Sequence, residues 1–87
     1  MEIKTKFNVG DKVYPIHIPL GKEIFMVMDK VEIKAITVVI DKNGIEIDYD
    51  FQWVRGLKYF NNHCFEQYCF ATKEQAQAEC DKRNKGE

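Results

Sequence analysis

The sequence lacks any apolar run long enough to cross a membrane. A membrane-spanning helix needs about 20 consecutive apolar residues, and the apolar runs of this 87-residue chain are far shorter. No apolar segment with a small-residue cleavage site follows Met1, so a secretory signal is not expected either. We therefore expect a single domain in the cytoplasm, which is the host cytoplasm if the protein is phage-encoded, with no contact to a membrane.

The sequence also lacks the cysteine spacing of a metal site, because its three cysteines stand singly. An odd number of cysteines cannot pair fully within one chain, which fits a reducing compartment. Cys64, Cys69 and Cys80 with His63 carry the right atoms for zinc, but structural zinc sites bring their ligands in close pairs such as C-x2-C. We expect no metal and no cofactor, and we interpret Cys69 and Cys80 as small core residues.

The chain has no excess of positive charge. Its formal net charge is −1, which removes the broad electrostatic attraction that dominates non-specific binding to nucleic acid. A smaller basic face stays open as an alternative, and nucleic-acid binding is therefore the less favoured of two binding hypotheses. The lysines that would form that face are Lys4, Lys6, Lys12, Lys30 and Lys34.

Groups suited to catalysis are present without the pattern that catalysis requires. Neither His17 nor His63 stands in a motif that supplies a nucleophile and a residue to orient the base, so we expect no enzyme. Glu46, Asp48 and Asp50 occupy alternate positions, which in a strand places them on one face about 7 Å apart. Such an acidic stripe can hold a cation or act as an acid pair. We favour the simpler interpretation of a solvated face that discourages aggregation.

The stretch Val31–Phe51 carries the strongest structural signal. Asn43-Gly44 lies between two runs of β-branched residues, and this dipeptide favours a two-residue type I′ hairpin turn. That turn would place Ile40 opposite Ile47, Val38 opposite Tyr49 and Ile36 opposite Phe51. Every apolar residue of one strand would then meet an apolar residue of the other, with the acidic stripe on the opposite face.

A change of phase within the first of these strands predicts a bend. Apolar residues occupy odd positions up to Ala35 and even positions from Ile36 onward, which one flat strand cannot place on one face. A β-bulge near Ala35 resolves the conflict and lets one long strand serve two parts of a small barrel. The core is predicted to include Val13, Ile33, Ile36, Val38, Ile40, Ile45, Ile47 and Phe70.

The rest of the chain predicts short strands and one helix. Thr72 and Gln75 form a capping box, and no helix breaker follows before Asn84, so the helix should span about residues 72–84. Pro15 should make the first strand an edge strand, or one that is paired only at its start. The short strands are expected at about Val13–Ile18, Ile24–Met28, Leu57–Phe60 and Tyr68–Phe70.

Two segments resemble known small proteins. Val9–Tyr14, VGDKVY, resembles the first strand of SH3-like barrels of the KOW and Tudor type. Cys69–Asn84, CFATKEQAQAECDKRN, is similar to the strand-and-helix ending of short proteins from bacteriophages and bacterial mobile elements. The resemblance implies a mostly β fold, namely a five-stranded antiparallel SH3-like barrel with one C-terminal helix. The loop glycines and basic residues of the KOW type are absent, so RNA binding is not carried over.

The function expected from these features is non-catalytic protein binding. The resemblance implies a phage or mobile-element protein, and one specific form is an inhibitor of a host defence protein such as a CRISPR nuclease, with the acidic stripe in the place of phosphates. A small structural subunit that self-associates through an edge strand is a further alternative, so the chain is expected as a monomer or weak homodimer. Methionine, aromatic and arginine side chains are typical of interface anchors. The predicted partner-binding residues are Phe25, Met26, Met28, Trp53, Arg55 and Tyr59.

Overall fold

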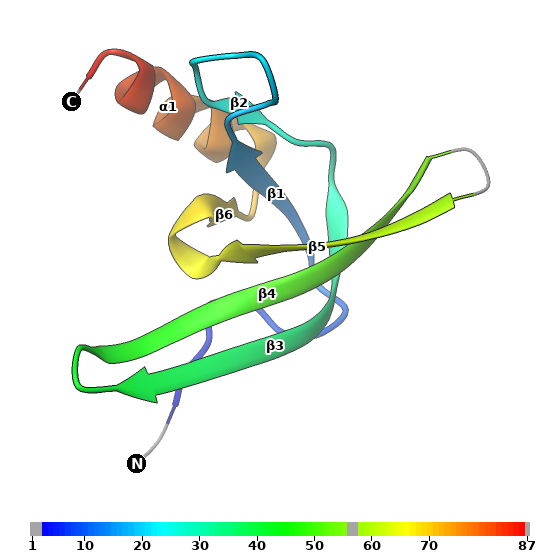
Figure 1. Ribbon diagram of the computed structural model, residues 1–87, viewed down its shortest axis with the longest axis vertical. Helices are drawn as coiled ribbons and strands as arrows, with labels where there is room; N and C mark the ends of the chain where they lie inside the picture. Colours follow the sequence, from blue (N-terminus) through cyan, green and yellow to red (C-terminus); the bar gives the residue numbers. More distant parts are fainter. Residues whose placement is uncertain (1–2, 56–57, 87) are drawn as a thin grey trace.

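A computed structural model describes residues 3–55 and 58–86, and side chains other than those of residues 53–61. The protein is mostly β, with a curled antiparallel sheet that forms a half-barrel and one C-terminal helix (Figure 1). The sheet has the order β2-β1-β3-β4-β5, and β6 pairs with β1 outside this path. The elements in chain order are β1 (Lys12–His17), β2 (Met26–Val27), β3 (Val31–Asp41), β4 (Gly44–Arg55), β5 (Lys58–Phe65), the 3-10 turn η1 (Glu66–Tyr68), β6 (Cys69–Phe70) and α1 (Lys73–Asn84).

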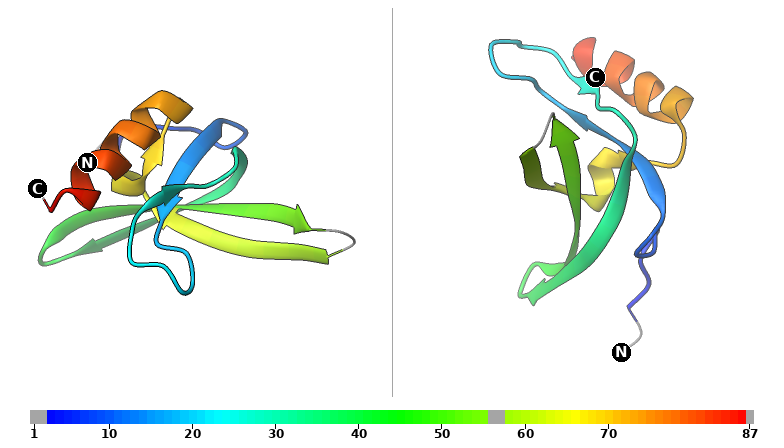
Figure 2. Two further views of the ribbon diagram at one scale, coloured as in Figure 1. Left: turned by 90° about the horizontal axis from the view of Figure 1, so that it is seen from above. Right: turned by 90° about the vertical axis from the view of Figure 1, so that its right-hand side faces the viewer.

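The long strands extend well beyond the packed body. β4 pairs with β3 along one part of its length and with β5 along another, and the two pairs project to opposite sides (Figure 2, left). The radius of gyration is 13.8 Å, whereas a compact chain of this length has about 12 Å. Much of the sheet surface is therefore not covered by a second layer.

β1 is the centre of the packed body, where it pairs with three other strands, including β6 near the C-terminal end of the chain. It pairs with β3 at Val13, with β6 at Tyr14 and Pro15, and with β2 at Ile16. The expectation that Pro15 would leave β1 at an edge or paired only at its start is wrong. Proline lacks an N–H but keeps its carbonyl, and the Pro15 carbonyl accepts the Met28 N–H at 2.8 Å.

Two apolar clusters form the core on either side of β1. The larger one contains strand residues that are almost completely buried, and the smaller one joins β1 to the inner face of α1. The larger cluster consists of Val13, Val31, Ile33, Tyr49, Phe51, Cys64 and Cys69, and the smaller of Ile16, Ala76 and Cys80. The three cysteines are free thiols in these clusters, as predicted for Cys69 and Cys80.

The predicted hairpin is present, but its register differs from the prediction by two residues. Asp41 faces Gly44 and Val38 faces Ile47, so the turn is made by Lys42-Asn43 rather than by Asn43-Gly44. A type I′ turn would need positive φ at Asn43, yet among the described residues only glycines have it. The Asp41 carboxylate accepts the Asn43 N–H at 2.7 Å and stabilises the observed turn. Because the shift is even, every side chain keeps its predicted face.

The predicted bulge in β3 is confirmed. Ile33 faces Phe51 and Ala35 faces Asp50, so Lys34 is the extra residue. The bend carries Ile33 into the larger core cluster, where it is fully buried.

Burial beyond the bend was predicted incorrectly. Ile40 and Ile45 face each other, as a core pair would, but their exposed fractions are 54% and 47%. Val38 is half-buried, and Ile36, Ile47 and Phe70 pack only at the rim of the clusters. The apolar face of the hairpin therefore continues past the end of the core.

The C-terminal helix agrees with its prediction. Thr72 is the N-cap, and its hydroxyl accepts the Gln75 N–H at 3.2 Å. Ala76 and Cys80 form the buried stripe of α1. No helix in the described part of the chain is both long and apolar enough to span a membrane.

Candidate protein-binding surface

The connection between β1 and β2 carries several exposed apolar side chains. Ile18, Ile24 and Met26 are about half exposed, and Leu20 is fully exposed. The segment Ile18–Met26, which we call the arm, turns at a hydrogen bond from the Lys22 N–H to the Pro19 carbonyl (3.0 Å). It projects from the body near the C-terminal end of α1 (Figures 1 and 2). Four exposed large apolar side chains on one short segment are typical of an interaction surface, although Gly21, Lys22 and Glu23 separate Leu20 from Ile24 in the sequence.

One residue of the arm fixes it to the helix. The Phe25 ring stacks on Tyr68 with 6.4 Å between ring centroids, and the Arg83 guanidinium lies over both rings at 5.3 and 4.9 Å. Asn84 accepts the Phe25 N–H at 2.7 Å and donates to its carbonyl at 3.1 Å. Phe25 thus anchors the arm, while the side chains before and after it stay exposed.

The two methionines predicted to bind a partner differ in their environments. Met26 is 43% exposed and lies on the arm, whereas Met28 is half-buried and packs against the larger core cluster. The side chains of Trp53, Arg55 and Tyr59 lie outside the part of the chain that the structure describes. The structure therefore brings Phe25, Met26 and Met28 together at one end of the sheet, and partner binding by all six residues stays a prediction.

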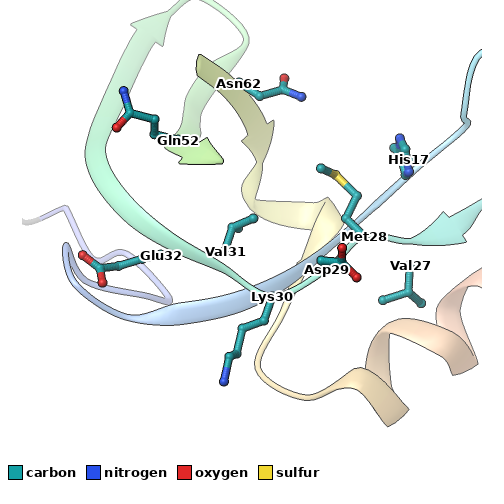
Figure 3. A pocket seen from close by; sticks show the side chains of 9 residues that line it. All are labelled: His17, Val27, Met28, Asp29, Lys30, Val31, Glu32, Gln52 and Asn62. Atoms are coloured by element: carbon teal, nitrogen blue, oxygen red, sulfur yellow. The ribbon is translucent and has the colours of Figure 1, made fainter. Parts of the chain in front are cut away.

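A cleft of about 650 Å³ lies beside the base of the arm. Met28 and Val31 supply apolar lining, and Gln52 of β4 and Asn62 of β5 border the cleft with side chains that point away from each other (Figure 3). Its mix of apolar and polar lining is typical of a site for a peptide or small ligand. The complete lining is His17, Val27, Met28, Asp29, Lys30, Val31, Glu32, Gln52 and Asn62.

Charges at the rim of the cleft are partly neutralised by one another. The Lys34 ammonium lies 2.9 Å from the Glu32 carboxylate. A hydrogen bond and the positive charge of Lys34 lower the pKa of Glu32 below its ordinary value. The other charged side chains that line the cleft are Asp29 and Lys30, so the lining carries charges of both signs.

The acidic stripe lies on one face of β4, as predicted, but its residues are not equivalent. The Asp50 carboxylate accepts a hydrogen bond from the Thr37 hydroxyl at 3.2 Å. His63 Nδ1 lies 2.9 Å from one carboxylate oxygen of Asp48. The other oxygen of Asp48 is buried and has no hydrogen-bond partner among the described residues. Glu46 is exposed near the hairpin tip, so the stripe presents one open carboxylate and two that are engaged within the sheet.

The thiols of Cys69 and Cys80 have little nucleophilic character in this structure. A hydrogen bond with Cys64 and burial both raise the pKa of Cys69, and burial raises that of Cys80. The thiolate is the reactive form of cysteine, so these shifts hold the sulfur atoms in their less reactive state. Within the described residues, no group of three or more His, Cys, Asp and Glu side chains is placed to hold a metal ion.

The cleft was not predicted from the sequence. Gln52 and Asn62 come from different strands, and the irregular turn Met28–Lys30 that forms the opposite wall follows a strand of only two residues. No local sequence motif marks such a site, because it exists only once β1, β3 and β4 are assembled. The one related signal in the sequence is the apolar run Ile24–Met28, which contributes Val27 and Met28 to the lining.

Comparison with known proteins gives this chain no family. No protein-family model matches it, and neither does any curated protein or solved structure.

Proposed function

We propose that this chain is a non-catalytic protein-binding module. The observation that carries the proposal is the set of exposed large apolar side chains on one anchored segment, with Leu20 fully exposed at its tip. Leaving such residues in water is unfavourable, and burial against a partner would recover that free energy. Phe25 holds the arm against the helix, so less conformational entropy would be lost on binding.

The form of the partner follows from the surroundings of the arm. The adjoining cleft combines apolar side chains with charged side chains of both signs, Asp29, Lys30 and Glu32, which suits a protein segment better than a polyanion. We further propose that the half-barrel is of SH3-like type, a proposal supported by β1 joining the β3–β4–β5 meander to the last strand, β6. A phage or mobile-element origin, and inhibition of a host defence protein, rest on the resemblance of Cys69–Asn84 and on the acidic stripe.

The experiment uses a photo-crosslinking residue at position 20 in the full chain, expressed in candidate host cells. We expect a discrete crosslinked protein. The companion variant Leu20→Ser, compared by quantitative co-purification, should lose that protein while keeping the melting temperature of the wild type.

Val9→Ser is the matched control. Val9 is also an exposed apolar residue, at 60%, but it lies at the turn before β1 and outside the arm. The proposal is wrong if Leu20→Ser and Val9→Ser retain the partner equally well. Binding of DNA or RNA below about 100 μM that strengthens as salt falls would favour the nucleic-acid alternative instead.

A further inference from the structure

The outer edge of β3 is open over most of its length. β1 pairs with β3 only at Val31 and Glu32, and the neighbouring backbone of Ile33 bonds to Gly10 and Asp11. From Ala35 to Asp41, β4 covers one edge and no described strand pairs with the other. This part of β3 belongs to the projecting hairpin, away from α1 and the arm (Figure 1).

The turn determines which backbone groups this edge presents. Asp41 and Gly44 flank a two-residue turn, and the pair that closes such a turn is a hydrogen-bonded pair. Bonded and non-bonded pairs alternate along an antiparallel ladder. Thr37 and Val39 therefore bond to β4, as Asp41 does. The N–H and C=O groups of Ile36, Val38 and Ile40 point away from β4, toward the open edge.

Between the bulge at Lys34 and the charged residue Asp41, this edge has none of the features that normally prevent pairing with another strand. Edge strands are usually interrupted by charged side chains, proline or bulges. The sequence Ile36–Ile40, ITVVI, contains no charge and no proline, and the bulge at Lys34 lies before it. Such an uncharged β-branched segment is a template for adding a strand.

The same segment is complementary to itself. In an antiparallel pair centred on Val38, that residue faces Val38 of a second copy, and Ile36 faces Ile40 of the second copy. The outward-pointing N–H and C=O groups of Ile36, Val38 and Ile40 in one copy then bond to those of the same three residues in the other copy. The side chains of all six residues stay on the apolar face of the hairpin. Thr37 faces Val39 of the second copy on the other face, where both side chains are uncharged.

We propose that two copies of this chain pair along these edges, about a two-fold axis at Val38, to form a four-stranded sheet β4-β3-β3-β4. The acidic stripes lie on the two outer strands, about 14 Å apart at a strand spacing of about 4.8 Å. This separation exceeds the screening length of about 8 Å at physiological salt, so their repulsion is small. The pairing also places exposed Ile40 beside Ile36 of the second copy.

The expected dimer is weak. The open edge is only seven residues long, about 24 Å at strand spacing, and the contact is smaller than the roughly 1,600 Å² of a typical stable complex. Association should therefore be followed from about 10 μM to about 1 mM by sedimentation velocity. This surface is separate from the arm, so the outcome does not depend on the proposed function.

Amide hydrogen exchange provides the decisive measurement on the wild-type chain. Protection of the Ile36, Val38 and Ile40 amides should rise with protein concentration, whereas the Thr37 and Val39 amides should be protected at every concentration. A chain that stays monomeric to about 1 mM contradicts the proposal. Concentration-dependent protection at other residues, without these three, would mean that a different surface self-associates, and the proposal would again be wrong.

A charge variant tests the position of the axis. Val38→Lys places two like charges directly opposite each other and should raise the dissociation constant about tenfold or more. Ile45→Lys is the control, since it adds the same charge to the same face of the hairpin, one strand away from the edge. The circular dichroism spectrum of each variant reports whether it is folded. Equal effects of the two folded variants on dimerisation would overturn the proposed register.

Discussion

The two halves of the β3–β4 hairpin have the same sequence pattern but opposite environments. Near the body, Ile33, Tyr49 and Phe51 are at most 2% exposed. Toward the tip, Ile40 and Ile45 are cross-strand neighbours on the same face but about half exposed. Strand β4 alternates apolar and polar side chains with period two through both halves, so the pattern itself cannot account for the difference.

What separates the halves is the second layer of structure. The buried half is covered by β1 and by β6 with the preceding turn, which contribute Val13 and Cys69 to the larger core cluster. Within residues 3–55 and 58–86, no further element covers the tip. Alternation therefore predicts which face is apolar, while burial depends on whether another segment reaches that face.

The largest effect should come from truncating the buried half. Phe51→Ala removes a ring that is 2% exposed and should lower the free energy of unfolding by about 3 to 5 kcal/mol. This loss is comparable with the whole stability of a small domain. Urea denaturation followed by circular dichroism measures it. A loss below about 1 kcal/mol would show that the two halves of the hairpin are energetically alike.

A smaller effect is expected where the buried half is tied to the N-terminal segment. The Tyr49 hydroxyl donates to the Glu66 carboxylate at 2.6 Å and accepts the Phe7 N–H at 3.1 Å, and the same carboxylate oxygen accepts the Lys6 N–H. Tyr49→Phe keeps the ring and removes this link. It should cost about 1 to 3 kcal/mol at neutral pH by chemical denaturation.

The same residue predicts a dependence on pH. Burial, and next the hydrogen bond to Glu66, raise the pKa of Tyr49 to about 12, whereas an unfolded tyrosine titrates near pH 10. Its raised pKa therefore contributes stability that is present in full below pH 10 and is lost between about pH 10 and 12. The difference in stability between wild type and Tyr49→Phe should shrink over that interval. A difference that stays constant would mean that the hydroxyl is not buried in this way.

The helix cap tests the other side of the packed body. Thr72→Ala removes the hydroxyl that accepts the Gln75 N–H and should cost about 1 kcal/mol, a typical value for loss of an N-cap. Because Asn84 at the end of α1 holds Phe25, part of this loss should be visible as faster hydrogen exchange in the arm. Thr72→Ser retains the hydroxyl and should behave as the wild type.

The smallest effect should come from the exposed half of the hairpin. Ile45→Thr keeps a β-branched residue at a position that is 47% exposed, and it should change stability by no more than about 0.5 kcal/mol. The measurement should be made at low protein concentration, where the chain is monomeric. A loss above about 2 kcal/mol would mean that the tip is covered within the monomer, which would remove the contrast between the two halves.

Several local features could be predicted from the sequence because local physics decides them. The capping residue Thr72, the bulge beside Ala35 and the faces of the hairpin residues all follow from short-range rules. The exact register does not, because two adjacent turns satisfy the same apolar alternation. In the observed turn the Asp41 carboxylate accepts a hydrogen bond from the Asn43 N–H. The apolar pattern carries no information about that hydrogen bond.

The candidate site was predictable only in outline. The run Ile24–Met28 indicated an apolar surface. Phe25 anchors the arm instead of staying exposed, and this depends on contacts with Arg83 and Asn84 near the other end of the chain. Likewise, the Glu66 side chain reaches Tyr49 and the Lys6 backbone only after folding. Contacts of this kind have no signature in a single sequence, since they depend on where distant segments meet.

The pairing of β1 with β6, near the opposite end of the chain, has a consequence for the order of folding. The β3–β4–β5 meander needs only short loops to close, whereas β1 must find β6, and Phe25 must find Asn84, which lies 59 residues further along the chain. Closing long loops is entropically costly and slows folding. The meander should therefore form the nucleus, with β1, β6 and α1 docking after the rate-limiting step. Mutations in the meander would then slow folding, while mutations at the β1–β6 contact would mainly speed unfolding. Stopped-flow kinetics measures both rates. If mutations at the β1–β6 contact slow folding and mutations in the meander mainly speed unfolding, the nucleus lies at the β1–β6 contact instead.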